Sequence, residues 1–154
     1  MMYYNYLYDS PFGRLRIVAT TEAIVEIYLR EEELPNGIYE ETPLILEAWK
    51  QLRDYFEGSR IFFDLPLAPA GTAFQKTVWD ALLEIPYGER CSYSQIACKI
   101  GNPRACRAVG MANNKNPILF VIPCHRVVGA SGDLVGYAAG LEVKARLLDL
   151  ENKK

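Results

Sequence analysis

The pattern of apolar residues changes from strand-like to helical along the chain, and this change limits the folds that it can adopt. Residues 3–8, 13–20 and 23–29 are rich in Tyr, Ile and Val and are separated by turn residues. This pattern predicts three short strands in an antiparallel meander. From Thr42 onward, most apolar residues follow helical spacing instead. Strands first and helices afterwards predict an α+β fold.

A proline-containing segment divides this fold into two expected domains. Thr42 and Pro43 suit the cap and first turn of a helix that would cover one face of the meander. Residues 62–71 contain two prolines and form the best linker candidate. We therefore expect a small antiparallel-sheet-plus-helix domain over residues 1–65 and a mainly helical domain over residues 71–154.

Two short helices in the second domain have the spacing of a helix-turn-helix motif. The first is expected over residues 92–100, with Gly101 after its end. The second is expected to start with Asn102 as its cap and Pro103 as its first residue, and to run to about Asn113.

The second of these helices carries residues suited to a DNA groove. Arg104 and Arg107 supply positive charge, while Ala105 and Ala108 are small enough to allow close approach. The motif therefore indicates contact with DNA.

Charge is divided unevenly between the two expected domains. Residues 1–65 hold six Lys or Arg and twelve Asp or Glu, a net charge of −6; residues 66–154 hold eleven and seven, a net charge of +4. The region from Gly88 to Val128 holds six basic residues and one acidic residue, Glu89. Such an excess suits a polyanion such as DNA, although charge alone is also consistent with an ordinary solvated surface.

Several classes of protein are disfavoured by what the sequence lacks. No apolar run approaches the roughly 20 residues that span a bilayer, and the first eight residues lack the features of a signal peptide. We therefore expect a cytoplasmic protein, or a nuclear one in a eukaryote, without a membrane partner. Without a secretory context we expect no disulfide framework among the four cysteines. The cysteines form no CxxC pair and the chain has one histidine, so we expect no zinc site.

The sole histidine, His125, directly follows Cys124. A thiolate attacks carbon far better than a thiol does, so a neighbouring base can turn a cysteine into a nucleophile. For an isolated pair, a buried cysteine beside a chance histidine is the simpler interpretation.

The residues around this pair resemble a known family. Pro123-Cys124-His125-Arg126-Val127 is similar to the active-site signature of the O6-alkylguanine-DNA alkyltransferases. The resemblance covers roughly residues 71–151. The other matching segments, in chain order, are Gly71-Thr72-Ala73-Phe74-Gln75, Val78-Trp79, Ile85-Pro86-Tyr87-Gly88, Ser92-Tyr93, Arg107-Ala108-Val109-Gly110, Asn116-Pro117, Gly136-Tyr137 and Leu147-Leu148-Asp149-Leu150-Glu151.

The resemblance implies a DNA repair reaction. In this family a cysteine, here Cys124, takes a methyl or other alkyl group from the O6 atom of guanine and keeps it as a thioether, so each molecule acts once and is inactivated. The implied partner is double-stranded DNA containing O6-alkylguanine, bound through the minor groove with the damaged base flipped out. The resemblance further implies a monomer that needs no cofactor, with cooperative binding to DNA left open.

The resemblance also implies roles for individual residues. His125 would act as general base through a water molecule, Glu151 would orient its imidazole, and Tyr93 would give a proton to the leaving guanine. Asn116 would tie the recognition helix to the active-site segment. Tyr137 would form part of the pocket wall and donate to the O6 atom.

Other residues would contact DNA or shape the pocket. Arg107 would fill the space left by the flipped base, and Arg104, Ala105 and Ala108 would lie in the groove. Arg126 would make structural or phosphate contacts. The resemblance leaves open which alkyl groups fit beside Val135 and Ala138.

Three alternatives to alkyl transfer remain at this stage. The chain could be a lesion-binding relative that marks damage without repairing it, although such relatives lack the reactive cysteine. It could be a DNA-binding regulator with a redox-sensing cysteine. A cysteine hydrolase is the third, and it would leave the DNA-facing helices unexplained.

Overall fold

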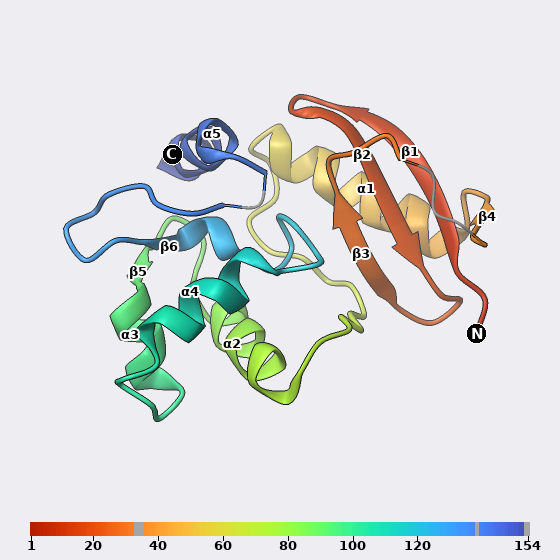
Figure 1. The fold of residues 1–154 in the computed structure, drawn as a ribbon. Coiled ribbons are helices and arrows are strands. Elements are labelled where there is room, and N and C mark those ends of the chain that lie inside the picture. Colours follow the sequence, from red (N-terminus) through yellow and green to blue (C-terminus); the bar gives the residue numbers. More distant parts are fainter. Residues whose placement is uncertain (33–35, 138, 153–154) are drawn as a thin grey trace. The chain divides into compact units, whose positions relative to one another are not determined.

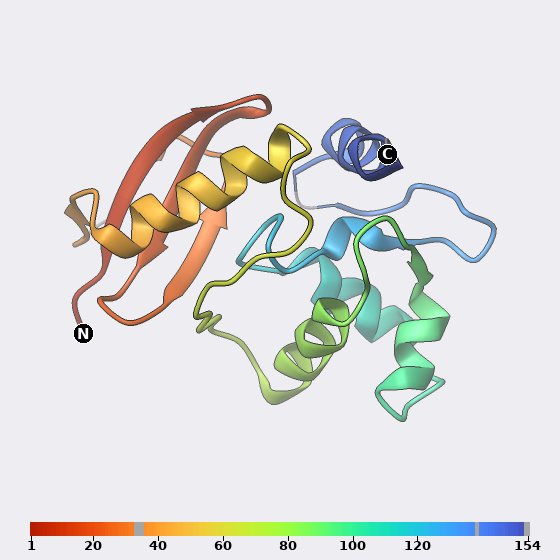
Figure 2. The same cartoon turned by 180° about the vertical axis from the view of Figure 1, so that it is seen from behind.

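The computed structural model describes residues 1–32, 36–137 and 139–152, which form two compact units, Met1–Ala70 and Gly71–Lys154 (Figures 1 and 2). Ala138, which was expected beside the pocket, lies outside the described residues. Within the described ranges, no helix is long and apolar enough to cross a membrane.

The first unit is built on a four-stranded sheet of order β3-β2-β1-β4. Strands β1 (Tyr4–Ser10), β2 (Gly13–Ala19) and β3 (Ile24–Tyr28) form the predicted antiparallel meander. A fourth strand, β4 (Ile38–Tyr39), pairs in parallel with β1. The sheet is therefore mixed, and the expectation of a purely antiparallel sheet is wrong at this edge.

Helix α1 (Pro43–Phe56) covers one face of the sheet (Figures 1 and 2). The Thr42 hydroxyl accepts from the Ile45 N–H, and Pro43 opens the helix, as predicted. A core of fully buried side chains forms in this unit, because β2 and β3 and one stripe of the helix are apolar. Its members include Leu15, Ile17, Ile24, Ile27, Ile45, Leu52 and Tyr55.

The expected linker is partly built into the first unit. The Ile24 N–H donates to the Pro66 carbonyl and the Ala68 N–H donates to the Ile24 carbonyl, both at 2.8 Å. These bonds attach the segment to β3, the edge strand of the sheet. The first unit accordingly extends to Ala70, five residues past the expected boundary.

The second unit contains helices α2 (Ala73–Leu83), α3 (Tyr93–Lys99), α4 (Cys106–Asn114) and α5 (Leu141–Asn152). Thr72 caps α2 and Ser92 caps α3, each in a capping box with a glutamine. Helices α3 and α4 are the pair predicted as a helix-turn-helix.

The start of α4 differs from the sequence prediction. The helix begins at Cys106, its N-cap is Ala105, and no side chain caps it. Asn102 lies instead in a turn, where its carbonyl accepts from the Ala105 N–H at 3.0 Å. The Asn102-Pro103 pair therefore makes the turn between the helices, a use that Asn-Pro also favours, and its assignment as a helix start is wrong.

A short parallel strand pair links two distant segments of this unit. Strand β5 (Cys91–Ser92) leads into α3, and it pairs with β6 (Val127–Val128). Directly before β6, residues Cys124–Arg126 form the 3-10 turn η1. The segment that enters the helix-turn-helix is thus hydrogen-bonded to the segment that leaves Cys124.

Candidate active site

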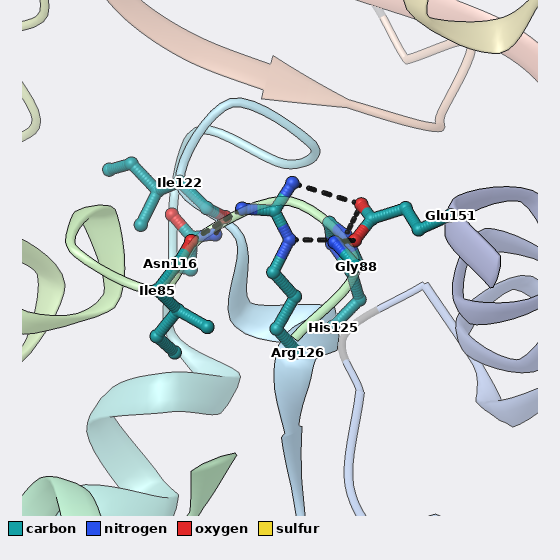
Figure 3. Close-up of polar contacts among 7 residues, drawn as sticks. All are labelled: Ile85, Gly88, Asn116, Ile122, His125, Arg126 and Glu151. Atoms are coloured by element: carbon teal, nitrogen blue, oxygen red, sulfur yellow. Dashed lines mark hydrogen bonds and ion pairs between the residues drawn. The ribbon is translucent and has the colours of Figure 1, made fainter. Parts of the chain in front are cut away.

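Cys124 is fully buried in η1 and is held by two asparagines at the end of α4 and just after it. Asn116 Nδ2 donates to Cys124 Sγ at 3.1 Å. It also donates to the Ile122 carbonyl at 2.8 Å (Figure 3). Asn113 Nδ2 donates to the Cys124 carbonyl at 3.3 Å. These bonds join the end of α4 to the thiol and to its backbone.

A buried cluster forms around Glu151 and includes His125 and Arg126, the two residues that follow Cys124 (Figure 3). Glu151 Oε2 is 2.8 Å from His125 Nε2 and accepts from Arg126 Nη2 at 3.0 Å. Its Oε1 accepts from Arg126 Nε at 2.8 Å and from the Gly88 N–H at 3.1 Å. One carboxylate therefore fixes the imidazole, the guanidinium and a turn of backbone together.

The environment of His125 favours a neutral imidazole. Complete burial lowers the pKa of His125, and the neighbouring Glu151 carboxylate opposes this shift only in part. In the neutral ring, a proton on Nε2 donates to Glu151, which leaves Nδ1 as the basic nitrogen. This is the tautomer that a general base facing away from its carboxylate requires.

Arg126 is held inside the protein rather than presented to DNA. Its guanidinium forms a two-pronged ion pair with Glu151 and donates from Nη1 to the Ile85 carbonyl at 2.7 Å (Figure 3). The side chain is buried. Of the two roles expected for Arg126, the geometry supports the structural one.

The Cys124 thiol is protonated at neutral pH in this arrangement. Burial raises the pKa of Cys124 to about 11, while the hydrogen bond from Asn116 and the charge of Lys144 act against that rise. Removing the proton therefore requires a base at the moment of reaction.

Lys144 is a residue of this site that the sequence motifs did not reveal. It lies on α5, fully buried, and its Nζ donates to the Val135 carbonyl at 2.8 Å and to the Gly136 carbonyl at 3.1 Å. Burial lowers the pKa of Lys144 to about 8, and the proximity of Cys124 raises it in opposition. A predominantly charged ammonium near the sulfur stabilises a developing thiolate.

Replacing Lys144 with methionine is expected to slow alkylation of the Cys124 thiol about tenfold at neutral pH. The change removes a cation that favours the thiolate, and one pKa unit corresponds to a factor of about ten. The rate at which Cys124 is alkylated measures the effect, with Lys76→Met, an exposed lysine of α2, as control. Equal rates in the two variants would contradict the role given to Lys144.

The two tyrosines border this cluster. Tyr93 donates its hydroxyl proton to the Val135 carbonyl at 2.7 Å. Burial raises the pKa of Tyr93, and Cys124 and Cys106 add to the shift, so the phenol keeps its proton at neutral pH. The Tyr137 ring is buried and stands edge-on to the His125 ring, with centroids 6.4 Å apart.

The remaining predicted residues lie apart from the cluster, at the surface of the helix-turn-helix. Arg107 and Ala108 are exposed on α4, and Arg104 is exposed in the turn before it. Ala105 is half-buried as the N-cap. The structure thus separates the predicted residues into a buried reactive group and an exposed helix surface.

The described ranges contain no cluster of side chains that could bind a metal ion. No three His, Cys, Asp or Glu side chains there lie close enough together to hold a metal ion. The four thiols are free, with Cys91 half-buried and Cys98 and Cys106 exposed.

Known family models match both units of the chain. Residues 73–153 match the model described as 6-O-methylguanine DNA methyltransferase, DNA binding domain. Residues 2–69 match the model described as 6-O-methylguanine DNA methyltransferase, ribonuclease-like domain. The match therefore extends to the first unit, where the sequence alone showed only a general layout.

Individual relatives are similar in sequence to this chain over nearly its whole length. A methylated-DNA–protein-cysteine methyltransferase of Methanosarcina acetivorans is 48% identical over 97% of this chain and 98% of its own length. The constitutive enzyme of that name from Bacillus subtilis is 44% identical over 93% and 92%. The crystal structure of Mycobacterium tuberculosis OGT in complex with DNA has a TM-score of 0.90 and 43% identity, covering 97% of this chain and 92% of that one.

Proposed function

The chain belongs to the 6-O-methylguanine DNA methyltransferase family, and we propose that Cys124 is the residue that accepts the alkyl group in its reaction. The reaction is DNA repair by alkyl transfer from methylated DNA to a protein cysteine. One observation carries the assignment of Cys124: the next residue, His125, is a buried imidazole held at 2.8 Å by the Glu151 carboxylate.

The first step is loss of the thiol proton as sulfur attacks the alkyl carbon. His125 Nδ1 takes the proton through a water molecule, because residues adjacent in sequence do not face each other on a helical turn. The imidazolium that forms is stabilised by Glu151, and Lys144 and Asn116 stabilise negative charge on the sulfur. A bond forms between sulfur and the methyl carbon as the bond from that carbon to O6 breaks.

The bonding electrons of the broken bond pass to the guanine, which then needs a proton. Tyr93 supplies it towards N3 of the base, and its raised pKa keeps that proton available at neutral pH. In the free protein the hydroxyl donates to the Val135 carbonyl. Tyr93 must therefore exchange this carbonyl for the base when DNA binds. Tyr137, from the same stretch of chain as Val135, donates to the O6 atom.

The products are guanine and S-methylcysteine. A thioether carbon is not released by water under mild conditions, so Cys124 is consumed and each molecule repairs one lesion. The proton taken up by His125 returns through solvent to Tyr93, so atoms and electrons balance without a redox partner or second substrate.

DNA contact is assigned to the exposed surface of the helix-turn-helix. Arg107 occupies the position of the flipped base, while Arg104, Ala105 and Ala108 lie at the minor groove. The partner is duplex DNA containing O6-alkylguanine, bound by a monomer in the cytoplasm, or in the nucleus of a eukaryote. The DNA complex of the M. tuberculosis relative supports DNA as the partner.

The proposal is tested on the DNA. A duplex with one O6-methylguanine is titrated with the protein, and the remaining lesion is quantified after enzymatic digestion to nucleosides. The expected result is loss of one lesion per molecule of active protein, with no further loss on longer incubation. Binding to the lesion without any loss would instead identify a damage-marking protein, and loss that continues past one equivalent would identify a turnover enzyme.

A further inference from the structure

The exposed side of α4 carries one large apolar residue among polar and small ones. Met111 is 69% exposed, while Val109, Ala112 and Asn113 are buried on the opposite side of the helix. A single exposed apolar residue is ordinary on a protein surface. Met111 is distinguished from such residues by the positively charged residues that lie around it on α4.

Cations flank Met111 at helical spacing. Arg107 lies four residues before it and Lys115, the C-cap of α4, four residues after it, and both are exposed. Residues 102–115 contain three basic residues and no acidic one. Met111 therefore stands in the middle of a positively charged surface, where a polyanion is the complementary partner.

The same helix side borders the residues of the reactive site. A Cβ placed on Gly110 would lie 3.8 Å from the Tyr93 ring, so the residue next to Met111 packs against the proposed proton donor. A Cβ on Gly136 would lie 3.0 Å from Asn114 Oδ1, which places the end of α4 against the chain segment that follows Val135. DNA held on this surface is therefore held beside the site of reaction.

We propose that Met111 enters the minor groove of bound DNA and packs against the deoxyribose rings of its walls. The inference rests on the proposed function, in which α4 is the helix that faces DNA. The sugar rings are the apolar part of the groove walls, and minor-groove proteins use apolar side chains of this kind beside their cations. The unbranched, polarizable Met side chain adapts to such an irregular surface.

The test measures affinity for an undamaged duplex by fluorescence anisotropy over a series of salt concentrations. Met111→Ala removes the apolar surface and is expected to weaken binding about tenfold, the effect of leaving most of a Met side chain without its buried contact. The slope of log affinity against log salt should not change, because no phosphate contact is lost. Lys115→Gln should instead reduce the slope by about 0.9.

Two further variants test whether the apolar character of Met111, rather than its size, supports binding. Met111→Gln keeps the length of the side chain and removes its apolar character, so it should weaken binding as Met111→Ala does. Leu83→Ala is the matched control, since Leu83 is an exposed apolar residue at the end of α2, and its affinity should equal that of the unmodified protein. Thermal unfolding by circular dichroism verifies that each variant is folded.

The inference is overturned if Met111→Ala binds within twofold of the unmodified protein, or if Met111→Gln retains full affinity. The experiment is independent of the chemistry, because undamaged DNA offers no group to transfer. Methyl transfer that persists while Met111 proves irrelevant to binding would refute only this inference. Met111-dependent binding without any transfer would refute only the proposed function.

Discussion

Cys124→Ala is expected to take up no methyl group from DNA while still binding it. Among the four thiols, Cys124 alone is fully buried beside a base, and the other three lie on β5, α3 and α4. The alanine side chain has no nucleophilic atom, and no other thiol has a histidine nearby in the sequence. Methyl uptake should therefore fall below detection rather than be slowed.

The fold should tolerate this change. Asn116 Nδ2 loses its contact with sulfur and keeps its bond to the Ile122 carbonyl, so the amide is not left without a partner. Loss of a buried sulfur leaves a small cavity, and the free energy of unfolding should fall by about 1–2 kcal/mol. Retained affinity for a methylated duplex shows that the variant is folded and that only the chemistry is lost.

Cys98→Ala serves as the matched control because it removes an exposed thiol of the same unit. This variant should take up one methyl group at the rate of the unmodified protein. Radiolabelled methyl from the duplex reports both variants in one experiment. Label on the Cys124→Ala protein would exclude Cys124 as the acceptor.

Glu151→Gln is expected to have the largest combined effect on stability and rate. The two carboxylate oxygens accept from His125, from two nitrogens of Arg126 and from the Gly88 N–H. An amide offers a single acceptor oxygen and turns an N–H group toward these donors. The Arg126 guanidinium would lose its countercharge while buried, a change that costs about 3–5 kcal/mol of the free energy of unfolding.

The reaction should slow for a second reason. Without the carboxylate, His125 loses the partner that fixes its tautomer and stabilises its protonated form, and general base catalysis is worth roughly 10²–10⁴ in rate. Urea unfolding measures the stability and single-turnover transfer measures the rate. Glu142→Gln, an exposed change in the first turn of α5, should leave both within error.

A double variant separates the two effects. Glu151→Gln combined with Arg126→Met removes the unpaired buried charge along with its partner, so part of the stability should return. Transfer should remain slow, because His125 still lacks its carboxylate. If Glu151→Gln alone matches the unmodified protein in stability and rate, the buried cluster has neither of the roles given to it.

The N-terminal ends of the helices show how much of this fold the sequence predicts. Thr42 and Ser92 were each identified at or next to the start of a helix, and the structure makes each of them an N-cap whose oxygen accepts a backbone N–H. Asn102 offers the same side-chain chemistry, yet it lies in a turn. Asn-Pro suits a turn as well as a helix start, and only the packing of α4 in its unit decides between them.

The short strands show what periodicity cannot supply. Strands β4, β5 and β6 have two residues each, too few for an alternation of apolar and polar residues to be visible. Each exists because a distant segment provides a hydrogen-bonding edge. Such pairings are tertiary in origin, and residues 66–68 joined the first unit for the same reason.

Some residues of the site could be predicted from the sequence and one could not. Cys124, His125 and Glu151 were predicted from their motifs, and a structural role was one of the two expected for Arg126, whereas Lys144 was not predicted at all. Lys144 does share a helical spacing of three, four and seven with Leu147, Leu148 and Glu151, all buried on α5. A lysine in an apolar stripe was therefore the available signal, but its two backbone acceptors come from a loop that the sequence does not position.

Peptide mapping of the reacted protein tests the central claim most directly. The protein is incubated with a duplex containing O6-methylguanine, digested with a protease and analysed by tandem mass spectrometry. We expect one added methyl group, located on Cys124, in a peptide that is otherwise unmodified. A methyl group on any other residue, or an unmodified Cys124 peptide after the lesion has disappeared from the DNA, would contradict it.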